Sequence, residues 1–286
     1  MESFKVLYEV LVKGEKVEVS DELLEQTLEL ASLNKVLLQF LRDLDLRGDL
    51  REREEMRYDM FIKAINEISG RLEGLNYAFF KILKPAYVPS DIDLLIDNTH
   101  LVSAISKLKE LGYVTEVIEP YCITLSSPRS IIDLYLHPTM GGVIYLDGKR
   151  LLEFRREIYF NGVRIPALEG YVEALVSAAH AIFKERIYTL NDYLVLAKLS
   201  SNKTFKLAEE LGCVETLLFA FKLNDSVEKG YLTLPYKVPL PLWLNILGSK
   251  VLRDPRARAS LPNIIKALRD PRAGKLIFSK IFRRSY

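Results

Sequence analysis

Two aspartates, Asp91 and Asp93, stand in the otherwise apolar run Ser-Asp-Ile-Asp-Leu-Leu-Ile-Asp at residues 90–97. Because alternate residues of a β-strand share a face, both carboxylates point the same way and the apolar side chains between them point toward a core. Two acids so close repel each other unless a cation or a proton lies between them. Magnesium, which prefers carboxylate oxygens and substrate phosphates, suits such a pair. The alternative is a pair of acids at an exposed strand end, since Asp-x-Asp also occurs by chance.

A third aspartate, Asp133, lies in a second strand-like run, Ser-Ile-Ile-Asp-Leu-Tyr-Leu-His-Pro at residues 130–138. Alternation places Asp133 on one face with Tyr135 and His137, and the aliphatic residues on the other. A lone carboxylate in such a strand is costly unless it is paired or binds metal. If the two strands are neighbours, three carboxylates converge on one site.

Such a site suits phosphoryl or nucleotidyl transfer, in which metal ions hold the phosphates and the protein mainly positions the reactants. We expect Asp91, Asp93 and Asp133 to be catalytic and to hold magnesium or manganese. Asp133 has the further role of base toward an attacking hydroxyl.

The elements that would position these acids divide the chain into three parts. Residues 1–74 read as mostly helical: a short hairpin strand at 16–19, then helices over about 21–47 and 50–68. Residues 75–166 read as an α/β core with a mixed sheet, and residues 167–286 as a C-terminal helical region with a basic tail. The expected class is therefore α+β. Within the core we expect strands at 77–83, 91–97, 113–118, 121–125 and 130–136, a helix at 99–111, and a hairpin at 154–166 around Asn161-Gly162.

The core contains a pattern that resembles a known superfamily. The run from residue 79 to 93, followed by Ile-Asp-Leu-Tyr-Leu-His at 132–137, is similar to the polymerase β-type nucleotidyltransferases, and most similar to their uncharacterised minimal members. Those proteins have a lysine after an apolar strand, a D-I-D pair, a later strand acid and a helical His-x-x-x-Lys segment. The matching residues here are Lys81, Asp91, Asp93, Asp133 with His137, and His180 with Lys184, followed by Asp192.

This resemblance, which covers residues 75–200, implies a nucleotidyltransferase-like mixed sheet flanked by helices. It implies a magnesium-dependent enzyme that moves a nucleotidyl group from a nucleoside triphosphate to an unknown acceptor, such as RNA or a protein. The three aspartates would hold the metal. The nucleotide would be contacted by Lys81, Lys84, Ser90, Lys184 and Arg186.

One feature of the superfamily is missing. Its members carry Gly-Gly or Gly-Ser upstream of the paired acids, where backbone amides cradle the triphosphate. Here the segment reads Phe-Lys-Ile-Leu-Lys at residues 80–84, without glycine. Lys81 and Lys84 would then bind phosphate as point charges. The alternative is a degenerate, non-catalytic relative that binds nucleic acid or a protein partner through the basic C-terminal region.

Charge is distributed unevenly over the 286 residues. Residues 248–286 hold eleven Lys/Arg against two Asp/Glu, so that a net +9 at this end and −7 over residues 1–247 give the total of +2. A basic end of this kind fits a phosphate-backbone contact, a membrane-surface helix or an ordinary surface that neutralises an acidic body.

Composition excludes several other classes of protein. With 49% hydrophobic and 27% charged residues, the chain is not disordered, collagenous or a disulfide scaffold. The two cysteines, Cys122 and Cys213, form no metal-binding or disulfide pattern. With neither a signal peptide nor a membrane span in the sequence, we expect a cytoplasmic protein. Scarce glutamine with abundant Lys, Arg and Glu favours a thermophilic source.

Overall fold

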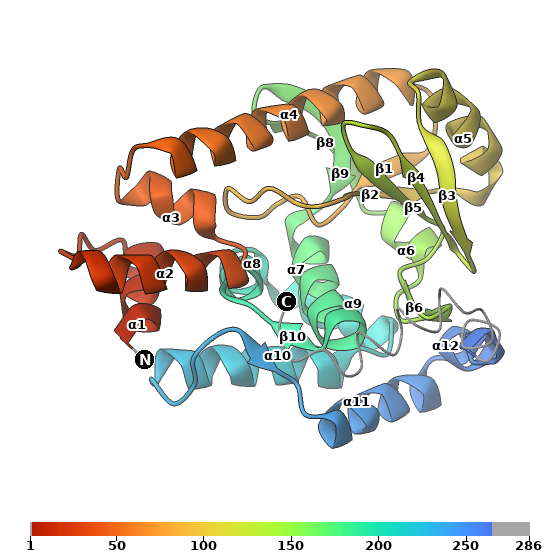
Figure 1. Cartoon of the computed structure of the whole chain (residues 1–286). Coiled ribbons are helices and arrows are strands. Elements are labelled where there is room, and N and C mark those ends of the chain that lie inside the picture. The colour runs from red at the N-terminus through yellow and green to blue at the C-terminus, as the bar shows by residue number, and fades with distance from the viewer. Residues whose placement is uncertain (1, 265–286) are drawn as a thin grey trace.

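The computed structural model describes residues 2–264, and its centre is a mixed seven-stranded sheet with helices on both faces (Figure 1). The strand order is β3-β4-β5-β2-β1-β9-β8. The predicted combination of a mixed sheet with flanking helices is therefore confirmed. The strands are β1 (Tyr77–Phe79), β2 (Ile92–Ile96), β3 (Val114–Glu119), β4 (Cys122–Ser126), β5 (Ile131–Tyr135), β8 (Arg155–Phe160) and β9 (Val163–Leu168).

The middle of the sheet is not built in chain order. β2 pairs antiparallel with β1 on one side and parallel with β5 on the other. The parallel pair requires a crossover, which contains the short 3₁₀ turn Asn98–His100, the helix α5 (Leu101–Glu110) and the strands β3 and β4. This crossover brings residues about forty positions apart in the chain to adjacent places in the sheet.

Each face of β2 and β5 contributes to a different apolar core. Ile92, Leu94 and Ile132 pack with α4 (Asp49–Arg71) and α5. Leu95 and Tyr135 point the other way and pack with α7 (Gly170–Ala179) and the N-terminal helices. The predicted alternation of the two strands is confirmed, because it places the acids on the α7 side of the sheet.

The N-terminal region differs from the prediction in two places. Residues 16–19 form no strand; the chain begins instead with α1 (Glu2–Tyr8) and a π-helical turn (Glu9–Lys13). The single helix predicted over residues 21–47 is two helices, α2 (Asp21–Leu33) and α3 (Leu37–Asp43). They are separated at Lys35, whose φ of 59° lies in the left-handed region and cannot continue a helix.

A short helix, α6 (Gly148–Leu152), lies inside the predicted α/β core and precedes the β8–β9 hairpin. In the described part of the predicted helical region, residues 167–264, the helices are α7, α8 (Leu190–Leu199), α9 (Asn202–Glu210), α10 (Val214–Glu228), α11 (Leu240–Arg253) and α12 (Pro255–Ser260), with a π-helical turn at His180–Glu185. Four short strands pair as β6 (Thr139–Met140) with β7 (Val143–Ile144) and β10 (Ile187–Tyr188) with β11 (Tyr236–Lys237). Every helix within residues 2–264 is too short or too polar to span a bilayer. The domain boundaries at residues 74 and 166 stay predictions.

The basic C-terminal region lies partly outside the described residues. Its first four cations are described, and they contact the chain's own groups. Arg253 pairs with Glu215 at 2.5 Å, Arg256 pairs with Asp147 at 2.9 Å, and the guanidinium of Arg258 donates to backbone carbonyls. The fourth, Lys250, is buried and pairs with Asp254 at 2.5 Å. The other seven cations lie between residues 265 and 286.

Candidate active site

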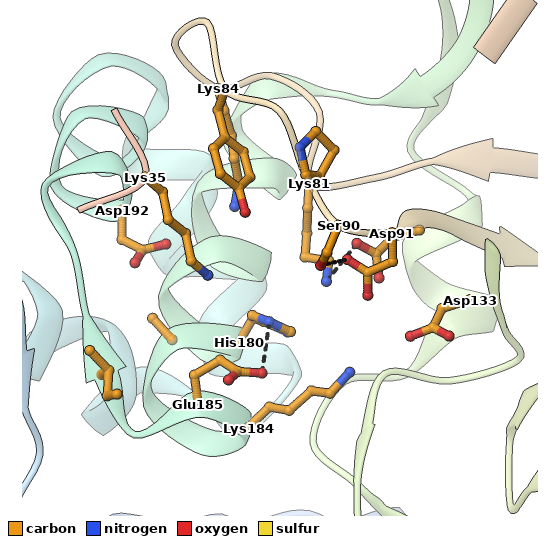
Figure 2. A pocket seen from close by; sticks show the side chains of 15 residues that line it. Lys35, Lys81, Lys84, Ser90, Asp91, Asp133, His180, Lys184, Glu185 and Asp192 are labelled. Carbon is orange, nitrogen blue, oxygen red and sulfur yellow. Dashed lines mark hydrogen bonds and ion pairs between the residues drawn. The ribbon is translucent and has the colours of Figure 1, made fainter. Parts of the chain in front are cut away.

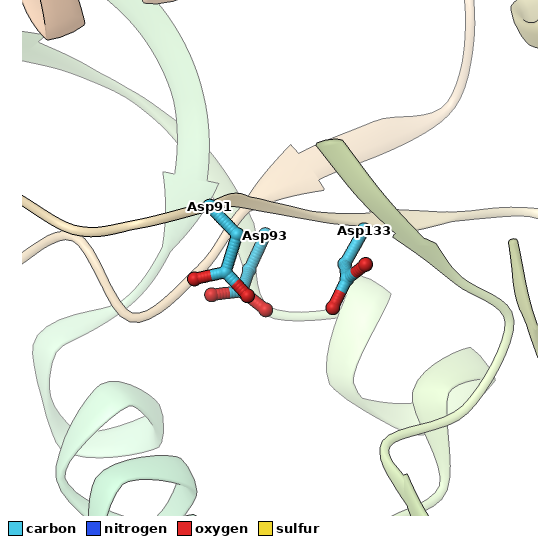
Figure 3. A group of neighbouring side chains, drawn as sticks. All are labelled: Asp91, Asp93 and Asp133. Carbon is cyan, nitrogen blue, oxygen red and sulfur yellow. The ribbon is translucent and has the colours of Figure 1, made fainter. Parts of the chain in front are cut away.

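Three aspartates meet on the face of the sheet that α7 covers. Asp93 and Asp133 are register partners in the parallel pair β2–β5, and Asp91 lies two residues before Asp93. One carboxylate oxygen from each of the three lies within 4.8 Å of the others (Figure 3). The condition set by the sequence, that the two strands be neighbours, is therefore met.

Lys81 compensates part of this negative charge. Its ammonium lies 2.7 Å from Asp93 Oδ2, and both side chains are almost completely buried. Burial raises the pKa of Asp93 to about 6, with Lys81 opposing the shift and the two neighbouring carboxylates adding to it. Burial also disfavours the charged form of Lys81, but the attraction of Asp93 and Asp91 outweighs it and raises the pKa of the lysine.

One of the two carboxylate oxygens of Asp93 is left without a hydrogen bond. Its Oδ1 is buried and has no hydrogen-bond partner among the described residues. A buried carboxylate oxygen without a partner is costly, because it has lost water without replacement. The atom lies beside two further carboxylates, which is the arrangement of oxygen donors that a hard divalent cation requires.

The backbone before the acids explains how Lys81 reaches them. β1 ends at Phe79, short of the predicted residue 83, and Lys81 adopts a φ of 60°. This left-handed turn is held by a buried carboxylate, since the Lys81 amide donates to Glu173 Oε1 at 2.8 Å. The Phe80 amide donates to the Asp93 carbonyl at 3.2 Å. These contacts fix the lysine against β2.

Asp133 is held by one side chain from the neighbouring strand β4 and one from its own strand, β5. Thr124 of β4 donates to its Oδ1 at 2.6 Å, and the Tyr135 hydroxyl donates to its Oδ2 at 3.0 Å. The same hydroxyl accepts a hydrogen bond from Lys184 at 2.6 Å. Burial disfavours the ammonium of Lys184, but Asp93 and Asp133 overcome this effect and raise its pKa. The chain Lys184–Tyr135–Asp133 therefore links the π-helical turn after α7 to the sheet.

The three aspartates line a cavity of about 410 Å³ together with Lys81 and Lys184 (Figure 2). Of the residues expected from sequence to contact nucleotide, Lys81, Lys84, Ser90 and Lys184 line it. Ser90 donates to Asp91 Oδ1 at 3.1 Å. Arg186 does not line this cavity. Its Nη2 donates to the Val238 carbonyl, and its guanidinium packs on the Trp243 ring.

The two histidines of the predicted pattern, His137 and His180, line different cavities. The ring of His137 accepts from the Gly148 amide and lines a separate cavity of about 580 Å³ near Asp147 and Arg256. His180 lines the aspartate cavity and lies 3.2 Å from the Tyr145 hydroxyl. Burial lowers the pKa of His180 well below its ordinary value, and four nearby lysines lower it further. It is therefore a neutral imidazole.

Sequence reasoning missed two residues of the site. Glu173 is a helix residue in an apolar context, and its burial is decided by packing on the loop of Lys81. Lys35 comes from the predicted interior of a helix in the N-terminal region, outside the resemblance, yet it lines the cavity. The pair Asn34-Lys35 was a signal for the helix break, since asparagine favours helix ends and turns.

The arrangement supports one kind of chemistry. Buried carboxylate oxygens on one wall suit a divalent cation, and lysine ammoniums around them suit phosphate oxygens. In Figure 2, Asp91 and Asp133 lie on one side of the cavity, and Lys35, Lys84 and His180 on the other.

Comparison with known proteins gives little beyond this. No protein-family model matches the chain, and no curated protein sequence matches it. Among solved structures, the chain is similar to an antigenic nucleotidyltransferase-like protein from Paracoccidioides brasiliensis, with 13% sequence identity and a TM-score of 0.35. That similarity covers 71% of this chain and 97% of the other. The function has to be argued from the geometry of the site.

Proposed function

We propose that the protein is a metal-dependent nucleotidyltransferase with a nucleotidyltransferase-like catalytic sheet, which moves a nucleotidyl group from a nucleoside triphosphate to an acceptor hydroxyl and releases pyrophosphate as the bond between the α- and β-phosphates breaks. Asp91, Asp93 and Asp133 hold magnesium or manganese. Lys81, Lys84, Ser90 and Lys184 contact the nucleotide, and Arg186 is assigned to it by resemblance alone. The catalytic part is residues 75–166, between a helical N-terminal region and a helical C-terminal region.

The observation that carries this proposal is the carboxylate triad with one orphaned oxygen. Three acids within 4.8 Å, one of them with an unpartnered buried Oδ1, offer more negative charge than Lys81 can neutralise. The donor set is oxygen alone, without histidine or cysteine, and this favours magnesium or manganese over zinc. A bound metal would polarise the phosphoryl group and neutralise the charge that develops on it.

Side chains of the protein would supply the proton transfer and the charge stabilisation that the metal does not. Asp133, oriented by Thr124 and Tyr135, takes the proton from the acceptor hydroxyl. Lys184 holds the Tyr135 hydroxyl and keeps positive charge beside Asp133 as that proton arrives. Lys81, fixed on Asp93, limits the repulsion among the acids before the substrates bind.

The test is a panel of labelled nucleoside triphosphates with Mg²⁺ or Mn²⁺, together with Mn²⁺ binding measured by electron paramagnetic resonance. We expect Asp93→Asn to lose Mn²⁺ binding and to reduce transfer on the order of 100-fold or more. Asp97→Asn is the matched control, because Asp97 follows the same strand and caps the next turn. Wild-type protein that binds neither metal nor nucleotide, or an Asp93→Asn variant that transfers normally, would refute the proposal.

The second candidate function is a non-catalytic relative that binds nucleic acid or a protein through residues 248–286. The four cations described in this segment contact the chain's own groups, and this favours a structural role for them. The candidate gains support if a salt-dependent nucleic-acid shift is lost on truncation before Gly248 while no nucleotide turns over. Binding that ignores salt would count against it.

A further inference from the structure

One half of the sheet has an exposed face beside Asp133, formed by β3, β4 and the first residues of β5. Val117 of the edge strand β3 and Thr124 of β4 are in register with Asp133, so their side chains share its face of the sheet. Three apolar side chains on that face are 40% to 57% exposed: Val114, Val117 and Ile131. We call this surface the open face. A ligand that lies on it is adjacent to the proposed general base.

The open face is acidic. Strands β3, β4 and β5 contain no lysine or arginine, whereas β3 carries Glu116 and Glu119. Ser126 donates to the Glu116 carboxylate at 2.6 Å, which holds that acid against β4. The arginine of the β4–β5 loop, Arg129, pairs with Glu67 of α4 at 3.4 Å. The two glutamates of β3 therefore dominate the charge of this surface.

The lysines around the aspartates belong to the cavity and not to the open face. In Figure 2, the four lysines that line the cavity all lie on the side of Asp133 that faces Asp91. A surface with acids and exposed apolar side chains repels the phosphate backbone of a nucleic acid. It suits a polypeptide with basic and apolar side chains, whose charge is complementary. The open face therefore favours such a polypeptide as the acceptor.

The chain leaves its described part close to the open face. The side chain of Asn263 donates to the Gly142 carbonyl at 3.3 Å. A methyl group added at Gly142 would lie 2.8 Å from the Asn263 Cβ and 3.3 Å from the Pro120 Cγ, so the three residues are neighbours. Pro120 directly follows β3. Residue 264, the last one described, is therefore near the end of the edge strand.

The segment 265–286 has the composition that the open face requires. It contains seven Lys/Arg against one Asp/Glu, and Ser279 stands in the apolar run Leu-Ile-Phe-Ser-Lys-Ile-Phe at residues 276–282. Because Glu119 is in register with Cys122 and, through it, with Tyr135, Asp133 lies about 12 Å from the end of β3. The stretch from 265 to 279 can extend to about 50 Å. Ser279 can therefore reach Asp133 within one chain.

We propose that residues 265–286 of the same chain bind the open face and that Ser279 is an acceptor of the nucleotidyl group. The inference rests on the proposed function and names the acceptor that it leaves open. The Ser279 oxygen bonds to the α-phosphorus of the nucleoside triphosphate, the bond between the α- and β-phosphates breaks, and pyrophosphate leaves. The hydroxyl proton passes to Asp133. The product is a phosphodiester between the nucleoside and Ser279, so the protein modifies itself.

The first test incubates the full chain with Mn²⁺ and nucleoside triphosphates labelled at the α-phosphorus, and locates the label by peptide mass spectrometry. Label should appear on Ser279 and be absent in Ser279→Ala and in Asp133→Asn. The double variant Glu116→Gln, Glu119→Gln removes the charge of the open face and should slow labelling about fivefold. Glu209→Gln, which changes an exposed acid of α9, is the matched control. Thermal unfolding of each variant identifies any that fails to fold.

The second test measures the binding of the segment without nucleotide. Trypsin cleaves after Lys275 and Lys280, and bound segment is protected from it because cleavage follows the population of the open form. In the double variant Glu116→Gln, Glu119→Gln, cleavage at these two lysines should be about fivefold faster than in the wild type. Equal cleavage rates would overturn the binding of the segment to the open face.

The outcomes separate this inference from the proposed function. Asp93-dependent release of pyrophosphate without label on Ser279 overturns the inference and leaves the proposed function standing. Label confined to an added RNA, or to other residues of the chain, overturns it in the same way. Labelling of Ser279 at the wild-type rate in the double variant overturns the role of the open face. A wild type that binds no Mn²⁺ and consumes no nucleotide refutes the proposed function itself, and the inference falls with it.

Discussion

Asp93 and Asp133 are register partners in two adjacent parallel strands, although forty residues separate them in the chain. Side chains directly opposite each other in neighbouring strands lie on the same face of the sheet. Both carboxylates therefore project toward α7, and Asp91 joins them from the position immediately before β2. The site follows from one strand pairing rather than from a local motif.

The ion pair between Lys81 and Asp93 predicts a metal-dependent stability. Lys81→Met leaves three neighbouring carboxylates without their buried counter-charge, and we expect the free energy of unfolding to fall by about 3–5 kcal/mol without metal. Saturating Mn²⁺ should recover part of this loss, because the cation replaces the ammonium. Urea unfolding with and without Mn²⁺ measures both effects. An equal loss with metal present, or in an Asp93→Asn background, would show that the charge pairing is not the cause.

The hydroxyl of Tyr135 predicts an effect on rate. Tyr135→Phe keeps the ring in the core but removes the bridge between Lys184 and Asp133, so the general base loses its orientation. We expect kcat to fall about 10- to 100-fold while KM for the nucleotide changes little. Tyr159→Phe, on an exposed tyrosine, is the control. A change in KM alone would place Tyr135 in binding instead.

Glu173 predicts a pH-dependent stability. Burial raises the pKa of this carboxyl to about 7, against hydrogen bonds from the Lys81 and Leu83 amides. A raised pKa means that the folded state binds the proton more tightly than the unfolded state. The resulting stability is complete below the ordinary pKa and is lost as pH rises through about 7.

The measurement compares wild type with Glu173→Gln, which keeps an acceptor for the Lys81 amide. Between roughly pH 4 and pH 8 the wild type should lose roughly 3 kcal/mol more than the variant. Chemical unfolding across this pH range gives the two slopes. Parallel slopes would mean that Glu173 titrates normally in the folded protein.

Lys250 predicts that part of the basic C-terminal region is structural. Its ammonium is buried, donates to the Leu211 carbonyl and pairs with Asp254, which also caps α12. Lys250→Met leaves Asp254 without its partner, and we expect a loss of about 3–5 kcal/mol in the free energy of unfolding. Lys222→Met, on an exposed lysine of α10, should change it by less than about 0.5 kcal/mol. Equal thermal shifts in the two variants would contradict this role.

Local patterns predicted much of the fold correctly. The turn residues Asn161-Gly162 lie between β8 and β9 as expected. The errors came where tertiary contacts override local preference. Lys35 breaks a helix because buried hydrogen bonds of Asn34 stabilise the turn, and β1 ends early because Glu173 holds Lys81 in a left-handed conformation.

The sequence by itself determined which side chains share a face. Because strand side chains alternate between two faces, Asp91 and Asp93 point to the face opposite the apolar side chains between them, and Asp133 points away from its aliphatic neighbours in the same way. This direction depends only on the backbone of the strand itself. Tertiary structure decided which strands are neighbours, since pairing across forty residues depends on the whole packed sheet. It also brought Lys35 into the lining of the cavity and placed Glu173 against the Lys81 amide, both from parts of the chain far from the acids. Those residues carry no local signal of the site, because burial and hydrogen bonding create their roles.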